Sequence, residues 1–223
     1  MGPAVIALVV LALIFVAVLA YRHDRKRRRL LSAWAHARGF RLYETSQRGW
    51  DERYPGLSLF GRGRSRHTAR HLEGEVDGRR VRCLDYRFTT GSGKNRRNHR
   101  FGVVVLDAGT PVIPLCIRSE HIFDKMGEFF GHDDLDFESA EFSRRFHVSS
   151  ADRRWAYDVI HQRTMDYLLG APPGTVEFGF AEVAVYRRGA LAGHDCQDML
   201  QMARRMLDLV PPDVLAQIKG EPH

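Results

Sequence analysis

The sequence predicts an α+β protein, in which one N-terminal transmembrane helix is followed by a single domain with an antiparallel sheet and helices packed on it. Three observations predict this class. Residues 3–20 form an unbroken apolar run, short stretches typical of strands fill the middle of the chain, and the long helical patterns come after residue 150. With 223 residues, 44% of them hydrophobic, and only three cysteines, the chain is neither disordered nor a disulfide scaffold.

The apolar run has the length and the flanks of a membrane anchor. Residues 1–21 carry no charged side chain, and at about 1.5 Å per residue a helix of this length spans roughly the 30 Å of a hydrocarbon core. Tyr21 stands where an interfacial aromatic residue is typical. A cleaved signal peptide has basic residues before its apolar segment, whereas here they follow it. We therefore expect a transmembrane helix over residues 1–21.

A cluster of cations follows the apolar run directly. Its members are Arg22, Arg25, Lys26, Arg27, Arg28 and Arg29. With one acid among them they contribute +5 to the net charge of +7, and the rest of the chain holds 28 basic and 26 acidic side chains. The positive-inside rule then predicts a single-pass protein of the cell membrane, with its N-terminus outside and its domain in the cytoplasm. We expect the six cations to contact anionic headgroups, each stabilising the contact by about 1 kcal/mol.

The rest of the chain divides into a basic juxtamembrane segment with a short helix, residues 22–38, and a cytoplasmic α+β domain, residues 39–223. The helical spacing covers Leu30–Arg38 and ends at Gly39, a residue typical of helix ends. Residues 48–70 show no sustained period and are expected to be irregular. Asp77-Gly78 then predicts a tight hairpin turn between two alternating stretches.

Periodicity and turn residues assign the remaining elements. We expect strands over Leu72–Val76, Val81–Phe88, Phe101–Leu106, Val112–Ile117 and Phe142–Val148, with a loop over Thr89–Arg100. A helix with Ser150 as its N-cap should run to Gly170, followed by a hairpin over Thr175–Arg187 and a last helix over Asp195–Leu209. Strands in a run with helices segregated after them indicate α+β rather than a doubly wound sheet.

The string Thr89-Thr90-Gly91-Ser92-Gly93-Lys94 resembles a phosphate-binding loop but departs from that pattern. Phe88 stands where the first glycine is required, and Asn95 stands where a hydroxyl residue should follow the lysine. The sequence therefore predicts a mobile loop whose Lys94, Arg96 and Arg97 are solvated or face anionic headgroups. Two basic stretches, 61–70 and 91–100, are the surfaces expected to face lipid or an acidic partner.

The other polar motifs are weaker evidence for a functional site. The segment His132–Asp136 contains candidate metal ligands, and Asp134 with Asp136 would form the site of a membrane-bound enzyme. Adjacent residues rarely converge on one centre, so a turn is favoured, and we expect no metal and no cofactor. His67 and His71 lack the helix that a zinc pair at this spacing needs, and a surface loop is favoured. Three cysteines, Cys83, Cys116 and Cys196, are expected to be buried and unpaired.

Several strings together resemble a family of uncharacterised bacterial membrane-anchored proteins. They are Asp85-Tyr86-Arg87-Phe88-Thr89-Thr90-Gly91-Ser92-Gly93-Lys94, Arg118-Ser119-Glu120, Gly131-His132-Asp133-Asp134-Leu135-Asp136-Phe137 and Phe142-Ser143. The resemblance covers roughly residues 74–186 and departs from the family pattern at His132 and Leu135, where Tyr and Ile are usual. It implies a membrane-associated domain and no catalytic residue.

These observations predict a binding or scaffold module at the inner membrane face. Its expected partners are membrane lipids, which it reaches through the anchor. A protein partner is the second candidate. The near balance of charge beyond residue 29 argues against nucleic acid. The alternative is the membrane-bound enzyme with its site around Asp134 and Asp136, which would place both carboxylates in a polar cleft.

Overall fold

The computed structural model describes residues 2–119 and 135–220. The chain begins with one helix, α1 (Pro3–Ala37), of 35 residues. The transmembrane helix and the short helix near residue 30 that the sequence predicts as separate elements are one continuous helix. The linking residues are mostly Arg, Lys and Leu, which favour helix and contain no glycine or proline. Gly39, at φ +71°, follows the helix end and lets the chain turn into the domain.

The domain is built on an eight-stranded antiparallel sheet, which confirms the predicted α+β class. The strand order is β1-β2-β3-β4-β8-β7-β5-β6, and the neighbouring pairs are antiparallel. The strands are β1 (Arg41–Tyr43), β2 (Arg64–Val76), β3 (Arg79–Thr90), β4 (Arg97–Asp107), β5 (Leu115–Ser119), β6 (Phe146–Ser150), β7 (Thr175–Phe178) and β8 (Glu182–Arg188). Asp77 and Gly78 both have positive φ, so the turn predicted between β2 and β3 is confirmed.

The helices lie before, between and after the strands. They are α2 (Trp50–Arg53), α3 (Ala140–Arg145), α4 (Arg153–Val159), α5 (Gln162–Gly170), α6 (Gly193–Leu209) and α7 (Pro212–Lys219), with short 3₁₀ turns η1 (Ser58–Gly61) and η2 (Gly93–Asn95). The single helix predicted after Ser150 is two helices, capped first by Asp152, whose carboxylate accepts from the Trp155 N–H at 3.0 Å. The break follows Val159, and the ring of His161 bonds the Leu209 carbonyl at the end of α6, 2.9 Å away.

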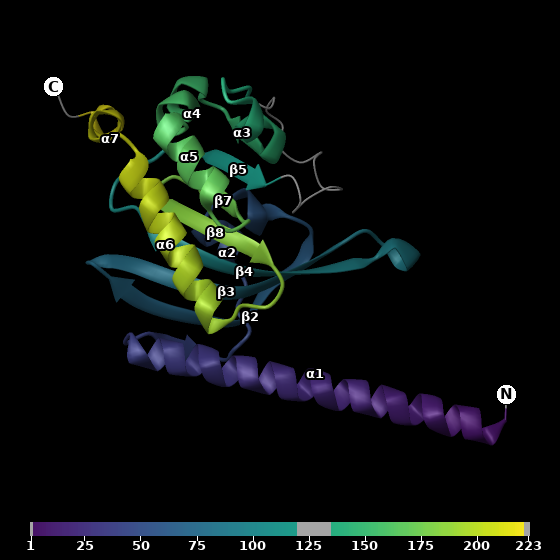
Figure 1. Ribbon diagram of the computed structural model, residues 1–223. Helices are drawn as coiled ribbons and strands as arrows, with labels where there is room; N and C mark the ends of the chain where they lie inside the picture. The colour runs from purple at the N-terminus through teal and green to yellow at the C-terminus, as the bar shows by residue number, and fades with distance from the viewer. Residues whose placement is uncertain (1, 120–134, 221–223) are drawn as a thin grey trace.

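Two hydrophobic cores cover the two faces of the sheet. One face packs against the end of α1 and against α3 to α7, which contribute residues such as Leu31, Trp155 and Met199. The other face is covered by the segment around α2 and η1, where Trp50 packs on Phe60 and Phe60 packs on Tyr86. In Figure 1 α6 crosses one side of the sheet, and α1 runs along the edge of the domain before its N-terminal part extends beyond it. Helix α1 is therefore held to the domain by its C-terminal third.

The β3–β4 hairpin is longer than the sequence predicted. The expected loop over Thr89–Arg100 is wrong in extent, because Thr90 pairs with Arg97 and only the tip lies between the strands. The Thr89 hydroxyl lies 3.1 Å from the Asn98 amide oxygen, and Thr90 Oγ1 lies 2.7 Å from His99 Nε2. These cross-strand contacts continue the ladder through residues that have no apolar pattern.

Two other expectations need correction. Residues 48–70 are not irregular throughout, since they contain α2, η1 and the first half of β2. The strand predicted over Phe142–Val148 begins only at Phe146. Its first half is α3, which Ser139 caps by accepting from the Phe142 N–H at 3.2 Å. A local cap therefore outweighs the β-like pattern there.

Candidate functional site

A buried carboxylate joins the hairpin to α1. Asp85 of β3 is fully buried, and its two oxygens accept from Nε and Nη2 of Arg100 on β4, at 2.7 and 2.5 Å. Arg27 of α1 also faces this carboxylate, with Nη1 3.9 Å from Asp85 Oδ2. Paired guanidinium groups are what a buried carboxylate requires to remain charged. Asp85 is thus the electrostatic link between helix and sheet.

Arg27 is held on the domain side of α1 by further contacts. Its Nη1 donates to the Leu191 carbonyl and its Nη2 donates to Asp24, both at 2.5 Å. The Arg27 and Arg28 guanidinium groups keep the pKa of Asp24 well below its ordinary value, against a smaller effect of burial. Only 8% of Arg27 is exposed, so its guanidinium faces the domain rather than lipid headgroups. This corrects the expected lipid-contact role of Arg27.

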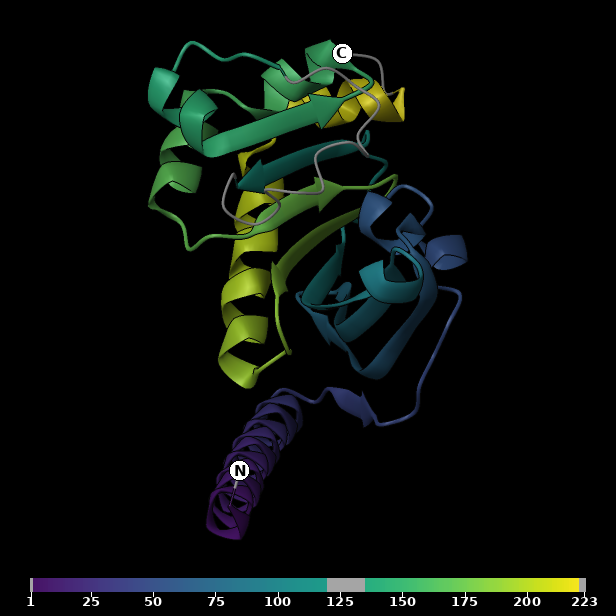
Figure 2. The ribbon, with the colours of Figure 1, turned by 90° about the vertical axis from the view of Figure 1, so that its right-hand side faces the viewer.

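The hairpin and the apolar half of α1 point in the same direction. In Figure 1 the hairpin tip extends toward the same side as the N-terminus, and in Figure 2 both point at the viewer. The tip of the hairpin therefore lies on the side of the domain toward which the apolar run of α1 extends.

Six of the predicted cations are exposed, on two elements. Arg22, Arg25 and Lys26 lie on α1, and Lys94, Arg96 and Arg97 lie at the hairpin tip. For the role proposed below we call these six residues the membrane-facing surface. Arg28 is exposed too but is tied to Asp24, whose Oδ2 accepts from its Nε at 2.6 Å. Arg29 is exposed on α1 beside the domain. Two stretches about 70 positions apart in the sequence thus supply these exposed cations.

Gly91 shapes the hairpin tip. It has φ +70°, and a Cβ at this position would lie 2.3 Å from the Asn95 carbonyl oxygen. The Arg64 guanidinium donates to the Gly91 carbonyl. The glycines that suggested a phosphate loop therefore close a tight hairpin tip instead.

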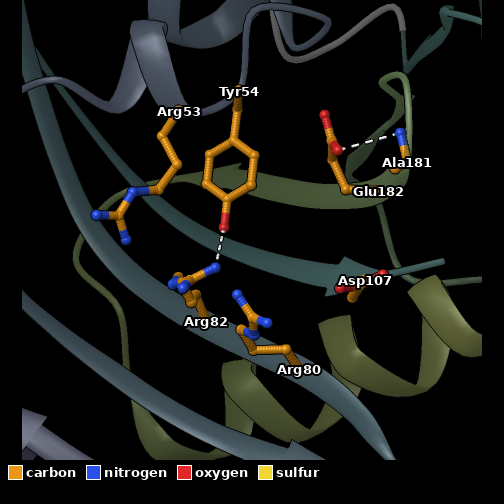
Figure 3. A pocket seen from close by; sticks show the side chains of 7 residues that line it. All are labelled: Arg53, Tyr54, Arg80, Arg82, Asp107, Ala181 and Glu182. Atoms are coloured by element: carbon orange, nitrogen blue, oxygen red, sulfur yellow. Dashed lines mark hydrogen bonds between the residues drawn. The ribbon is translucent and has the colours of Figure 1, made fainter. Parts of the chain in front are cut away.

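A second polar cluster lies at the opposite end of the sheet, in a pocket of about 380 Å³ (Figure 3). Arg53, Arg80 and Arg82 lie on one side of it, and Asp107 and Glu182 on the other. Arg82 donates to Glu73 from Nε at 2.8 Å and to the Tyr54 hydroxyl from Nη1 at 2.5 Å. Burial raises the pKa of both Tyr54 and Glu182. The Arg82 contacts tie β3 to β2 and to the segment that covers them.

A buried carboxylate on β7 was not among the residues predicted from the sequence. Glu177 is only 3% exposed, and its Oε1 accepts from the Ser58 N–H at 2.6 Å. The Tyr186 hydroxyl lies 3.3 Å from its Oε2. Burial raises the pKa of Glu177, and the Ser58 contacts and the charge of Arg62 oppose that rise. Glu177 thus fixes the η1 segment on the sheet, and an acid in a short apolar strand was the available signal.

Replacing Glu177 with Gln should make stability less dependent on pH. A raised pKa in the folded state means that folding favours protonated Glu177, so its contribution falls as pH rises from about 4 through the folded pKa. The difference in free energy of unfolding between E177Q and wild type should therefore shift in favour of E177Q over that range. Urea unfolding at several pH values measures it, with the exposed Glu75→Gln as the control. A difference that does not change with pH would contradict this assignment.

Among the described residues, the structure does not bring the other predicted site residues together into a site. Asp134 lies outside the described residues, and Asp136 is exposed, with its backbone carbonyl 3.3 Å from the Tyr157 hydroxyl. His67 and His71 are in β2 rather than in a surface loop, and the His71 ring stacks on Tyr43. Within residues 2–119 and 135–220, no cluster of three or more His, Cys, Asp or Glu side chains is placed to hold a metal ion. The cysteines Cys83, Cys116 and Cys196 are buried and unpaired, as expected.

The fold defines a class of protein, an antiparallel α+β domain carried on a long apolar helix. One solved structure with this fold is the crystal structure of the mycobacterial trehalose monomycolate transport factor A, TtfA. The match has a TM-score of 0.60 and 14% sequence identity, and it covers 82% of this chain and 96% of that one. At this identity the likeness shows the fold alone. No family model and no curated protein matches the chain.

Proposed function

We propose that this protein is a membrane-anchored binding or scaffold module whose domain docks on the anionic inner leaflet of the cell membrane. One observation carries the proposal, namely that exposed cations follow the apolar run of α1 directly and that the cation-bearing tip of the β3–β4 hairpin extends toward the same side as that run. Cations near an anionic leaflet each stabilise binding by about 1 kcal/mol. The domain would then be held at a fixed height and orientation.

The properties of α1 support the membrane anchor. Its segment Val5–Ala37 is long and apolar enough to cross a membrane, with a mean hydropathy of 2.7 in its most apolar window. None of that window is buried against the domain. Side chains such as Leu8 and Leu11 are about two-thirds exposed, at 70% and 68%. An apolar surface of this extent indicates a partner that covers it, and hydrocarbon fits its length.

The orientation and the family assignment are parts of the same proposal. The positive-inside rule supports an outside N-terminus and a cytoplasmic domain, because the cations follow the apolar run. TtfA is named as a transport factor, and a membrane-tethered scaffold is compatible with that name. The resemblance to uncharacterised bacterial membrane-anchored proteins is in line with the same role. Protein partners of this domain belong to the proposal as well.

The test places a fluorescent label at the hairpin tip of the full chain. Because Cys83, Cys116 and Cys196 are buried, an exposed cysteine introduced as Ser92→Cys should be labelled selectively. In vesicles containing anionic lipid and lipid with a spin-labelled headgroup, its fluorescence should be strongly quenched. The control is Glu75→Cys, at the far end of the hairpin's strands and about 35 Å away along β3. Equal quenching at the two positions would refute the docked orientation.

A further inference from the structure

A groove of about 740 Å³ lies between α1 and the segment that leads into α6. Its helix wall is a stripe at helical spacing, formed by Val16, Leu19, Ala20, His23, Asp24 and Arg27. The first three belong to the apolar run and the last three follow it. The groove therefore begins beside the hydrocarbon level and ends at the headgroup level, if α1 spans the membrane as proposed above. Its volume is within the range of about 300–1,000 Å³ that is typical of small-molecule binding sites.

The domain wall of the groove combines small and polar side chains. Ala190 and Ala192 line it together with Arg100, His194 and Asp195. Small residues leave room beside α1, where larger side chains would close the space. A chain-like apolar group can therefore lie against Val16 and Leu19 and reach the polar end without crossing bulky side chains.

The charges that line the groove balance. Two guanidinium groups, Arg27 and Arg100, face two carboxylates, Asp24 and Asp195, and the histidines are neutral at pH 7 in the formal count. A headgroup with net negative charge would meet two carboxylates, whereas one with a phosphate and an ammonium group complements both signs. This balance distinguishes the groove from the basic membrane-facing surface.

Two of the polar groups, Arg100 and Asp195, keep capacity for a ligand. Arg100 uses Nε and Nη2 on Asp85, which leaves the N–H groups of Nη1. Asp195 Oδ2 accepts from the Ala192 N–H at 3.1 Å, and its Oδ1 lies 3.4 Å from His194 Nε2. Carboxylate oxygens accept more than one hydrogen bond each, so an ammonium group can still donate to Asp195.

We propose that the groove binds one phospholipid with an ethanolamine headgroup. Its acyl chain lies along Val16, Leu19 and Ala20, its phosphate accepts from Arg100, and its ammonium group donates to Asp195. A choline headgroup has no N–H to donate, and a glycerol headgroup leaves the phosphate charge unbalanced against Asp24 and Asp195. This assignment rests on the membrane anchoring of α1 and adds a specific lipid to it.

The experiment uses the full chain in nanodiscs with equal parts of phosphatidylethanolamine, phosphatidylcholine and phosphatidylglycerol. After transfer to mild detergent, native mass spectrometry counts the lipids that each chain retains. We expect one phosphatidylethanolamine per chain. Ala20→Trp, which fills the groove, should reduce that fraction about tenfold, the loss of roughly 1.4 kcal/mol of binding. Val18→Trp is the matched control, because Val18 lies at the same depth on the opposite side of α1, and it should retain the lipid.

Three results would overturn the assignment. They are retention of the three lipids in the ratio of the disc, preferential retention of phosphatidylglycerol, and equal loss in Ala20→Trp and Val18→Trp. The labelled Ser92→Cys chain in the same discs separates this inference from the docking proposal. A quenched hairpin without a retained lipid overturns the groove assignment alone. An unquenched hairpin with retained phosphatidylethanolamine overturns the docked orientation and supports the groove.

Discussion

Replacing Asp85 with Asn is expected to lower the free energy of unfolding by about 3 kcal/mol, because removing one member of a buried ion pair leaves its partners uncompensated. The Asp85 side chain is fully buried, and its carboxylate binds Arg100 and also faces the Arg27 guanidinium, whose Nη1 donates to the Leu191 carbonyl. Loss of the carboxylate should therefore weaken both the hairpin and the docking of α1. Urea unfolding of the full chain in micelles, followed by tryptophan fluorescence, measures the change.

The matched control for this prediction is Asp77→Asn. Asp77 pairs with Arg204, but its side chain is 65% exposed, and an exposed pair typically contributes less than about 1 kcal/mol. D77N should therefore unfold close to wild type. If D85N were as stable as D77N, Asp85 would not be the electrostatic link between helix and sheet.

Removing the hairpin cations is expected to weaken binding to anionic vesicles about 100-fold. The variant replaces Lys94, Arg96 and Arg97 with Gln, and three cations at about 1 kcal/mol each correspond to roughly 3 kcal/mol. Flotation of residues 22–223 with vesicles of graded phosphatidylglycerol content measures the affinity without the anchor. The loss should shrink at high salt, because screening already weakens these contacts in the unmodified domain.

A second triple variant separates position from total charge. Arg144, Arg145 and Arg154 are exposed on α3 and α4, away from α1, and replacing them with Gln removes the same number of cations. This variant should bind vesicles almost as well as the unmodified domain. Equal losses in the two triple variants would mean that net charge rather than the membrane-facing surface governs binding.

Local composition explains what the sequence could predict. The apolar run and the cations after it are contiguous, and the Asp77-Gly78 turn needs only neighbouring residues with positive φ. The hairpin over Thr175–Arg187 was equally readable, and β7 and β8 pair there. Each of these features depends on residues close in sequence, where periodicity and turn chemistry are informative.

Tertiary contacts explain what it could not. The strands continue through polar residues such as Asn98 because cross-strand pairing, rather than core burial, holds them there. The role of Arg27 depends on Asp85, which is far away in sequence. One signal was available, because Asp85 stands between Leu84 and Tyr86 in a strand that is buried on both faces. A charge at such a position requires partners, but the sequence does not say which elements supply them.

The position of the domain relative to the membrane is tested most directly by labelling with a membrane-impermeant maleimide. Two single-cysteine additions are compared in the full chain, Gly2→Cys before the apolar run and Glu75→Cys in the domain. In intact cells the reagent should label Gly2→Cys and leave Glu75→Cys unmodified until the membrane is permeabilised. Labelling of Glu75→Cys in intact cells, with Gly2→Cys protected, would contradict a domain held at the inner face.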